Sequence, residues 1–223
     1  MSSTYPSSLP SPGRTGRIAV PPAVTIMAVG VFAAGTSEFM PSGLLPAIAR
    51  DFAIDIPHAG LTVSIFAIGM VIGGLLSALA TTRWSQRSLL LSAIVTLAIG
   101  HVIGALASSF EGLLVSRLVS ALATGAFWTI AAVVAVTITP EGARARALAR
   151  LVGGMTLANI IGVPLGTAIG QDHGWRITFW AVAVIASLAA CAVYARVPEP
   201  PRNAHAPGPV SYTHLTLPTS DLV

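Results

Sequence analysis

The chain has 223 residues, of which 54% are hydrophobic and only 9% are charged, and its formal net charge is +4. Soluble domains carry about 25% charged residues, so this composition excludes an ordinary soluble protein and indicates an integral membrane protein. The positive charges are spread along the chain and form no basic patch, so nucleic acid is not an expected partner.

Six apolar runs are each long enough for the ~20 residues that a helix needs to cross a bilayer. We expect them near residues 23–48, 59–82, 89–107, 112–138, 150–170 and 177–196. Residues 21–198 are therefore predicted to form an all-α bundle of six transmembrane helices within the lipid bilayer. Between the fourth and fifth runs, Thr139 and Pro140 suit the start of a helix, so residues 139–150 predict a short basic helix at the membrane surface.

The two ends of the chain differ from the bundle in composition. Residues 1–20 are rich in Ser and Pro and predict a disordered cytoplasmic lead. Residues 199–209 are expected to begin a cytoplasmic linker. Residues 210–223 are polar and β-branched, and the string PVSYTHLTLPTSDLV resembles the translation of a sequencing-library adapter. We expect a non-native tail there, with a genuine linker as the alternative.

The arginines predict the orientation of the bundle. Nine of them lie before the first run, in alternate loops or after the sixth run: Arg14, Arg17, Arg83, Arg87, Arg144, Arg146, Arg150, Arg196 and Arg202. The other set of loops holds only Arg50 and Arg176. Positively charged loops stay in the cytoplasm, so both termini are predicted to be cytoplasmic, in a bacterial inner membrane.

Small residues recur at four-residue spacing in three of the runs. The stripes are Gly69, Gly73 and Ser77; Gly100, Gly104 and Ser108; and Gly162, Gly166 and Gly170. Such stripes let helix backbones approach closely in lipid. We expect them to pack the bundle, with Pro164 bending the fifth helix.

Ionisable groups inside a bilayer are costly and are candidates for function. Glu38 lies in the apolar stretch GTSEFMPSGLLPAIA, and Arg117 lies in the fourth run. At 1.5 Å per residue, Glu38 is roughly 16 Å below the outer surface and Arg117 roughly 9 Å below it. The two side chains can meet if their helices face each other. His101 is either a proton relay or, as we favour, a hydrogen-bonded packing residue.

Three motifs, in this order, are similar to those of the drug:proton antiporter branch of the major facilitator superfamily. They are GTSEFMPSGLLPAIARDF, SRLVSALATGAFW, and NIIGVPLGTAIG with QDHGWRITFW. The first resembles the arabinose-efflux and chloramphenicol-resistance exporters. The likeness covers residues 24–198 and implies the N-terminal half of a twelve-helix transporter, whose C-terminal half would be the missing partner.

The loop after the second run departs from the family pattern of Gly, then Asp-Arg, then Gly-Arg-Arg. The stretch ALATTRWSQRS keeps only Arg83 and Arg87 of that pattern. The absent Asp leaves two roles open for these arginines, in a cytoplasmic gate or as charges that orient the protein.

The resemblance implies that the first and fourth helices line a central cavity and that the protein exports small, largely apolar compounds in exchange for protons. A phenicol-type antibiotic is the favoured substrate, and a sugar or other metabolite is the alternative. Glu38 with Arg117 is expected to couple protons, or else to form a static pair. Phe127, Trp128 and Asn159 are weaker candidates for substrate contact.

Other classes remain as alternatives: an inactive gene fragment, or a membrane protein that packs without transporting. An enzyme is not expected, because the chain has no HExxH, GxSxG or clustered acid pair. We also expect no catalytic residue, no cofactor and no metal site.

Overall fold

A computed structural model describes residues 19–81 and 83–199 of the chain. The predicted tail, nearly all of the predicted lead and nearly all of the predicted linker lie outside the described residues. Within the described ranges every regular element is helical. The all-α class and the six predicted spans are therefore confirmed.

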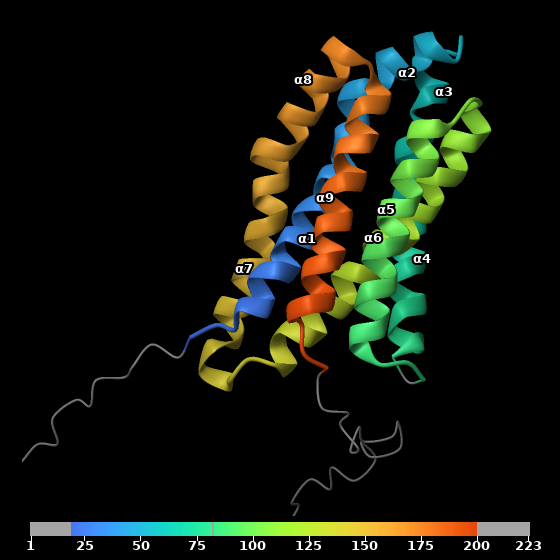
Figure 1. Ribbon diagram of the computed structural model, residues 1–223. Helices are drawn as coiled ribbons and strands as arrows, with labels where there is room; N and C mark the ends of the chain where they lie inside the picture. The colour runs from blue at the N-terminus through green and yellow to red at the C-terminus, as the bar shows by residue number, and fades with distance from the viewer. Residues whose placement is uncertain (1–18, 82, 200–223) are drawn as a thin grey trace, which may run out of the picture.

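Each span is built from one to four helical pieces. The first is α1 (Pro22–Phe39), a 3-10 turn (Met40–Leu44) and α2 (Leu45–Asp51); the second is α3 (Ile56–Ala59) and α4 (Leu61–Ala80). The third is α5 (Gln86–Leu106) and the fourth is α6 (Phe110–Thr137). The fifth is a 3-10 turn (Glu141–Ala143), α7 (Arg144–Leu157), a π turn (Ala158–Gly162) and α8 (Val163–His173); the sixth is α9 (Trp175–Arg196). All six run side by side, and both described ends of the chain lie at the same end of the bundle (Figure 1).

Polar residues between the apolar runs start several helices. Ser85 accepts a hydrogen bond from the backbone N–H of Ser88 at 3.2 Å, and Ser109 accepts one from Gly112 at 3.1 Å. These caps satisfy N–H groups that have no partner inside the helix. The cap at Ser109 places Ser108 in the loop before α6, so the predicted small-residue stripe of the third span ends at Gly104.

The start of the fifth span corrects two predictions. Residues 139–150 do not form a separate surface helix, and the Thr139 side chain caps nothing; α7 begins at Arg144 and continues to Leu157 in the fifth span. The reason is a buried stripe that crosses the expected boundary, comprising Ala143, Ala147, Leu151 and Gly154. Because these residues share one helix face, α7 packs against α1.

The glycine stripe of α4 lies against α6. The buried residues of α4 are Thr62, Phe66, Gly69, Gly73 and Ser77. A Cβ added to Gly73 would meet the backbone of Leu122, and one added to Gly125 would meet the backbone of Met70. Backbone therefore touches backbone at both positions, as the small-residue pattern predicted for this pair.

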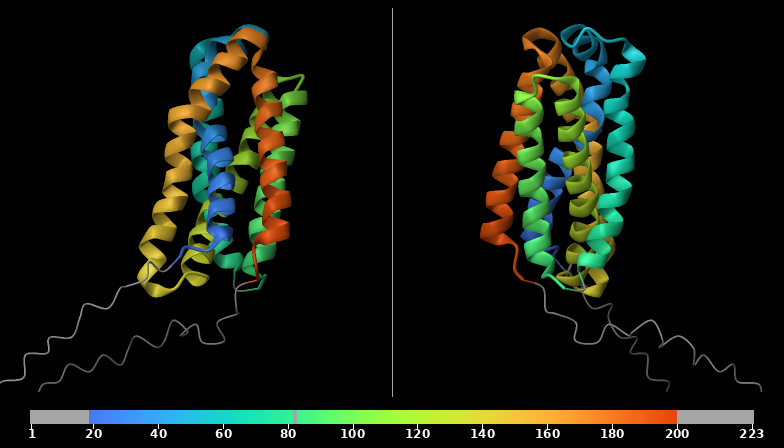
Figure 2. Two further views of the ribbon diagram at one scale, coloured as in Figure 1. Left: turned by 60° about the vertical axis from the view of Figure 1, so that its left-hand side comes forward. Right: turned by 90° about the vertical axis from the view of Figure 1, so that its right-hand side faces the viewer.

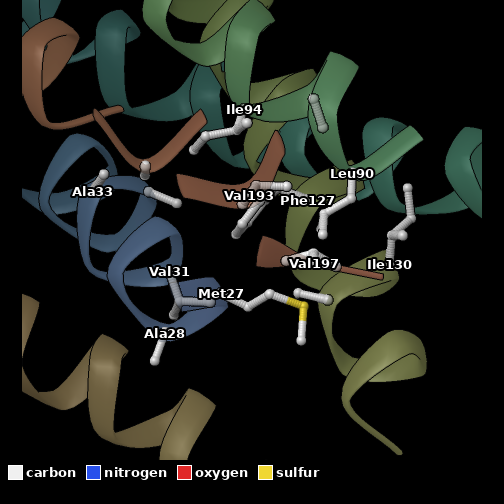
Figure 3. Close-up of a cluster of buried hydrophobic side chains, with 14 of the residues drawn as sticks. Met27, Ala28, Val31, Ala33, Leu90, Ile94, Phe127, Ile130, Val193 and Val197 are labelled. Carbon is white, nitrogen blue, oxygen red and sulfur yellow. The ribbon is translucent and has the colours of Figure 1, made fainter. Parts of the chain in front are cut away.

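The largest apolar cluster fills the space between α1, α5, α6 and α9. Figure 3 shows Met27 and Val31 from α1, Leu90 and Ile94 from α5, Phe127 and Ile130 from α6, and Val193 from α9. The further views in Figure 2 show α7 and α8 beside α1 and away from α5. Because the cluster contains residues of both α1 and α6, it holds these two helices together. They carry most of the site described below.

Substituting Gly125 with Ala is expected to destabilise the bundle by about 1–3 kcal/mol, because the added methyl overpacks a contact that only backbone can relieve. The matched control is Gly153→Ala, since a Cβ at Gly153 has nothing within 4 Å. The measurement is the free energy of unfolding in mixed detergent micelles. Equal stability of the two variants would contradict the close approach of α4 and α6.

Candidate functional site

Glu38 lies in the wall of a partly open cavity of about 240 Å³. The lining comes from α1, α4, α6, α7 and the π turn: Val31, Ala34, Glu38, Phe39, Met70, Thr124, Phe127, Trp128, Met155 and Asn159. All of the lining is apolar except Glu38, Thr124 and Asn159. Glu38 itself is half-buried, so its carboxylate meets the cavity and not the apolar core.

The structure brings together the four cavity residues that were picked from the sequence. Glu38, Phe127, Trp128 and Asn159 all line this one space. Phe127 is fully buried, and its ring lies where a Cβ on Gly30 of α1 would be. Trp128 is half-buried, and the Asn159 amide nitrogen donates to the carbonyl of Met155 at 3.0 Å.

Asn159 belongs to the π turn that interrupts the fifth span. The backbone N–H of Val163 bonds to the carbonyl of Ala158, five residues earlier, and Pro164 follows at once. Proline has no N–H to donate, so a wider turn before it accommodates the missing bond. Pro164 thus marks the irregular point in this span, and π turns of this kind are frequent at functional sites.

The three glycines of the fifth span lie against α1 and α9. A Cβ on Gly162 would meet the side chain of Thr36, and Cβ atoms on Gly166 and Gly170 would meet that of Thr178. Thr178 donates to the carbonyl of Gly166 at 2.9 Å, which adds a polar contact to this close approach. These glycines let α8 pack closely beside the first and sixth spans.

Arg117 does not occupy the cavity and does not form the expected bridge to Glu38. Its side chain is fully buried, where Nη1 donates to the carbonyl of Ser37 at 2.9 Å and Nε donates to that of Thr62 at 3.4 Å. The guanidinium also lies 4.1 Å from the centre of the Phe66 ring. Among the described residues, no salt bridge joins Arg117 to Glu38, but Arg117 contacts the carbonyl of Ser37, the residue that precedes Glu38.

His101 is buried beside α6 and lies outside the cavity. Its Nδ1 is 2.9 Å from the carbonyl of Leu97, and its ring centre is 5.5 Å from that of Phe179. This geometry is that of the packing residue favoured from the sequence.

Arg87, at the start of α5, is engaged with the end of α9. Its Nη2 donates to the carbonyl of Tyr194 at 2.7 Å, and its guanidinium lies 5.7 Å from the Tyr194 ring centre. Arg83 lies in the exposed turn after α4. At least one of the two predicted gate residues therefore ties two helices of this bundle together.

Six lining residues were not picked from the sequence: Val31, Ala34, Phe39, Met70, Thr124 and Met155. Helical spacing carries a signal for several of them. Val31 and Ala34 precede Glu38 by seven and four residues, and Thr124 precedes Trp128 by four. Residues at such spacings share a helix face. Met70 has no such link to a predicted residue, because its place depends on how α4 packs on α6.

The described residues hold no group of three or more His, Cys, Asp or Glu side chains that could bind a metal ion. What the arrangement provides is one ionisable carboxylate in an apolar cavity, with a buried guanidinium nearby. Such a carboxylate can take up and release a proton if the cavity is reached by water from alternate sides.

Comparison with known proteins agrees with this architecture. Residues 27–220 match the family model of the Major Facilitator Superfamily. The chain is 43% identical to the chloramphenicol resistance protein of Streptomyces lividans over 183 residues, which are 82% of this chain and 47% of that protein. It is 36% identical to a probable sugar efflux transporter of Mannheimia succiniciproducens over 81% of this chain and 46% of that protein.

Solved structures share the fold. The proton:xylose symporter XylE superposes with a TM-score of 0.68 at 21% identity, over 81% of this chain and 45% of that one. The chain spans about half the length of the curated relatives it matches. Its six-helix bundle thus corresponds to one half of a major facilitator fold, as predicted. From the family model, the relatives and the fold together, the chain belongs to the Major Facilitator Superfamily as a multi-pass membrane protein.

Proposed function

We propose that this six-helix unit is the N-terminal half of a secondary transporter that exports small, largely apolar compounds in exchange for protons. One observation carries the proposal: Glu38 is the single ionisable side chain in the lining of an apolar cavity. A buried carboxylate of this kind is a functional candidate by default. A proton leaves Glu38 when a substrate enters the cavity from inside, and returns from outside.

Arg117 influences proton exchange at Glu38 although it does not line the cavity. Because its guanidinium is held by two backbone carbonyls and an aromatic ring, it places a fixed positive charge near Glu38 without occupying the substrate space. Arginine does not lose its proton in proteins, so Arg117 tunes proton exchange and does not carry the proton. The absence of a direct ion pair argues against the alternative of a static Glu38–Arg117 bridge.

A phenicol-type antibiotic is the favoured substrate. The cavity walls are mainly aromatic and aliphatic, with three polar groups, and this lining suits an aromatic compound with few hydrogen-bonding groups. The Streptomyces relative carries chloramphenicol resistance in its name. A sugar exporter is the second candidate because another relative is named as one, but sugars need more polar partners than this lining supplies.

The partner of this unit is a second six-helix half. Alternating access in such folds rocks two halves around a site between them, and the lining described here comes from one side of such a site. Transport therefore belongs to the complete transporter that contains both halves. We place it in the bacterial inner membrane with both described ends of the bundle in the cytoplasm, because Arg83, Arg87, Arg144, Arg146, Arg150 and Arg196 lie at that end.

The function is tested by measuring accumulation of labelled chloramphenicol in efflux-deficient bacteria that express the complete transporter. We expect low accumulation that rises when a protonophore collapses the proton gradient. Labelled arabinose serves as the sugar probe, and its accumulation should be unaffected. Export of arabinose without export of chloramphenicol would favour the sugar exporter instead, and export of neither would support a protein that does not transport.

The orientation gives a separate prediction. After Cys191 is replaced, a single cysteine at Asp55 should react with a membrane-impermeant thiol reagent added outside the cell, and one at Ala145 should not. Both positions are exposed: Asp55 directly precedes α3 and Ala145 is in the first turn of α7, and these segments lie at opposite ends of the bundle (Figure 1). Permeabilised cells provide the control, since both cysteines should react there. The reverse pattern in intact cells would overturn the positive-inside assignment.

A further inference from the structure

The hydroxyl of Thr124 has no hydrogen-bond partner although it is buried. Many other hydroxyls inside helices bond to the preceding turn, although that of Ser37 in α1 is also buried without a partner. Those of Thr36, Ser77, Ser116, Thr129, Thr137 and Thr156 each donate to a carbonyl three or four residues earlier, at 2.7–3.0 Å. The side chain of Thr124 is 1% exposed and makes no such bond. A buried hydroxyl without a partner costs free energy, so it needs an explanation.

The position of Thr124 explains why its hydroxyl has no partner within the protein. Thr124 lies in the lining of the cavity that holds Glu38. Thr129, one turn further along α6, is absent from that lining and bonds to Gly125 instead. The one unsatisfied hydroxyl of α6 therefore belongs to a residue that lines the cavity.

Asn159 provides a second polar group in the same lining. Its amide nitrogen already donates to the Met155 carbonyl, which leaves the amide oxygen as an acceptor for a ligand. The remaining walls are Val31, Ala34, Phe39, Met70, Phe127, Trp128 and Met155. The volume of about 240 Å³ exceeds the roughly 150 Å³ of an apolar cavity known to bind benzene, so an aromatic ring with a short polar substituent fits.

We propose that Thr124 determines substrate specificity by hydrogen bonding a neutral hydroxyl or amide group of the substrate. This inference rests on the proposed export function and narrows its substrate class to neutral apolar compounds that carry such a group. A site built around a buried hydrogen-bonding group discriminates strongly against analogues that lack the matching group, because the protein group is then left unpaired.

The test compares three variants of the purified complete transporter by equilibrium binding of radiolabelled chloramphenicol, which carries hydroxyl and amide groups on an aromatic body. Thr124→Val removes the hydroxyl at nearly constant volume and should weaken binding about tenfold. Thr124→Ser keeps the hydroxyl and should bind within about twofold of the unsubstituted protein. Thr129→Val is the matched control on the same helix and should also stay within about twofold, because its hydroxyl lies outside the cavity.

Competition with naphthalene, which has no hydrogen-bonding group, provides a second readout. Thr124→Val should not weaken naphthalene binding, and this also shows that the variant is folded. Equal chloramphenicol affinity in Thr124→Val and the unsubstituted protein would overturn the assignment, as would equal losses in Thr124→Val and Thr129→Val. If the unsubstituted protein exports apolar compounds in exchange for protons but binds no chloramphenicol, the role of Thr124 is contradicted. The proposed export function is not contradicted by that result.

Discussion

Replacing Glu38 with Gln in the complete transporter is expected to abolish proton-driven export of chloramphenicol while the protein remains at its normal level in the membrane. Gln has nearly the same shape as protonated Glu and can make similar hydrogen bonds, but it cannot release a proton. Because Glu38 is the single ionisable residue lining the cavity, no neighbouring side chain in that lining can replace it. The measurement is chloramphenicol efflux from energised cells at several external pH values.

The control for this substitution is Glu111→Gln, which makes the same chemical change at the exposed start of α6. It should leave export unchanged. The two variants together separate loss of the proton site from loss of one negative charge on the protein. Wild-type efflux with wild-type pH dependence in Glu38→Gln would rule out Glu38 as the coupling group.

The Arg117→Ala variant is expected to lose both export and stability. It removes the guanidinium that joins α6 to Ser37 of α1 and Thr62 of α4, so two buried carbonyls lose their donor and Glu38 loses a nearby positive charge. Removing one member of such a buried charged network typically costs about 3–5 kcal/mol. Unfolding in mixed micelles should report the loss of stability, and efflux the loss of function.

Arg117→Lys tests whether charge alone is sufficient. Arg117 uses two different nitrogens to reach carbonyls on two helices, and a single ammonium group has no fork of this geometry. We therefore expect Lys to rescue little of the stability. Full export by Arg117→Ala would contradict the tuning role, and full stability of Arg117→Lys would show that the forked contact is unimportant.

Composition and hydrophobic length were sufficient to predict the fold class and the number of spans, because a bilayer imposes its thickness on every helix that crosses it. The glycine stripe of the second span was also predictable, since close packing in lipid selects small residues at four-residue spacing. The boundary of the fifth span was not predictable from the sequence. Its arginines suggested a surface helix, but the buried stripe from Ala143 to Gly154 continues through them, and α7 packs against α1.

The site was predictable where a residue is chemically unusual for its surroundings. Glu38 was predictable because an ionisable residue inside an apolar run is energetically costly and is therefore a candidate for function. The partners of Arg117 could not be predicted, because they are backbone carbonyls of Ser37 and Thr62, and every residue carries a carbonyl. Thr124 escaped notice for a related reason. A threonine in a helix is ordinary, and only the three-dimensional structure shows that its hydroxyl lacks a partner.

The central claim is that Glu38 exchanges a proton for a substrate bound in the same cavity. It is tested most directly by reconstituting the complete transporter in liposomes that hold a pH-sensitive dye and imposing a chloramphenicol gradient with no initial pH difference. The account predicts that protons move against the direction of chloramphenicol in the unsubstituted protein and do not move in Glu38→Gln. Chloramphenicol-driven proton movement of equal size in both proteins would contradict it.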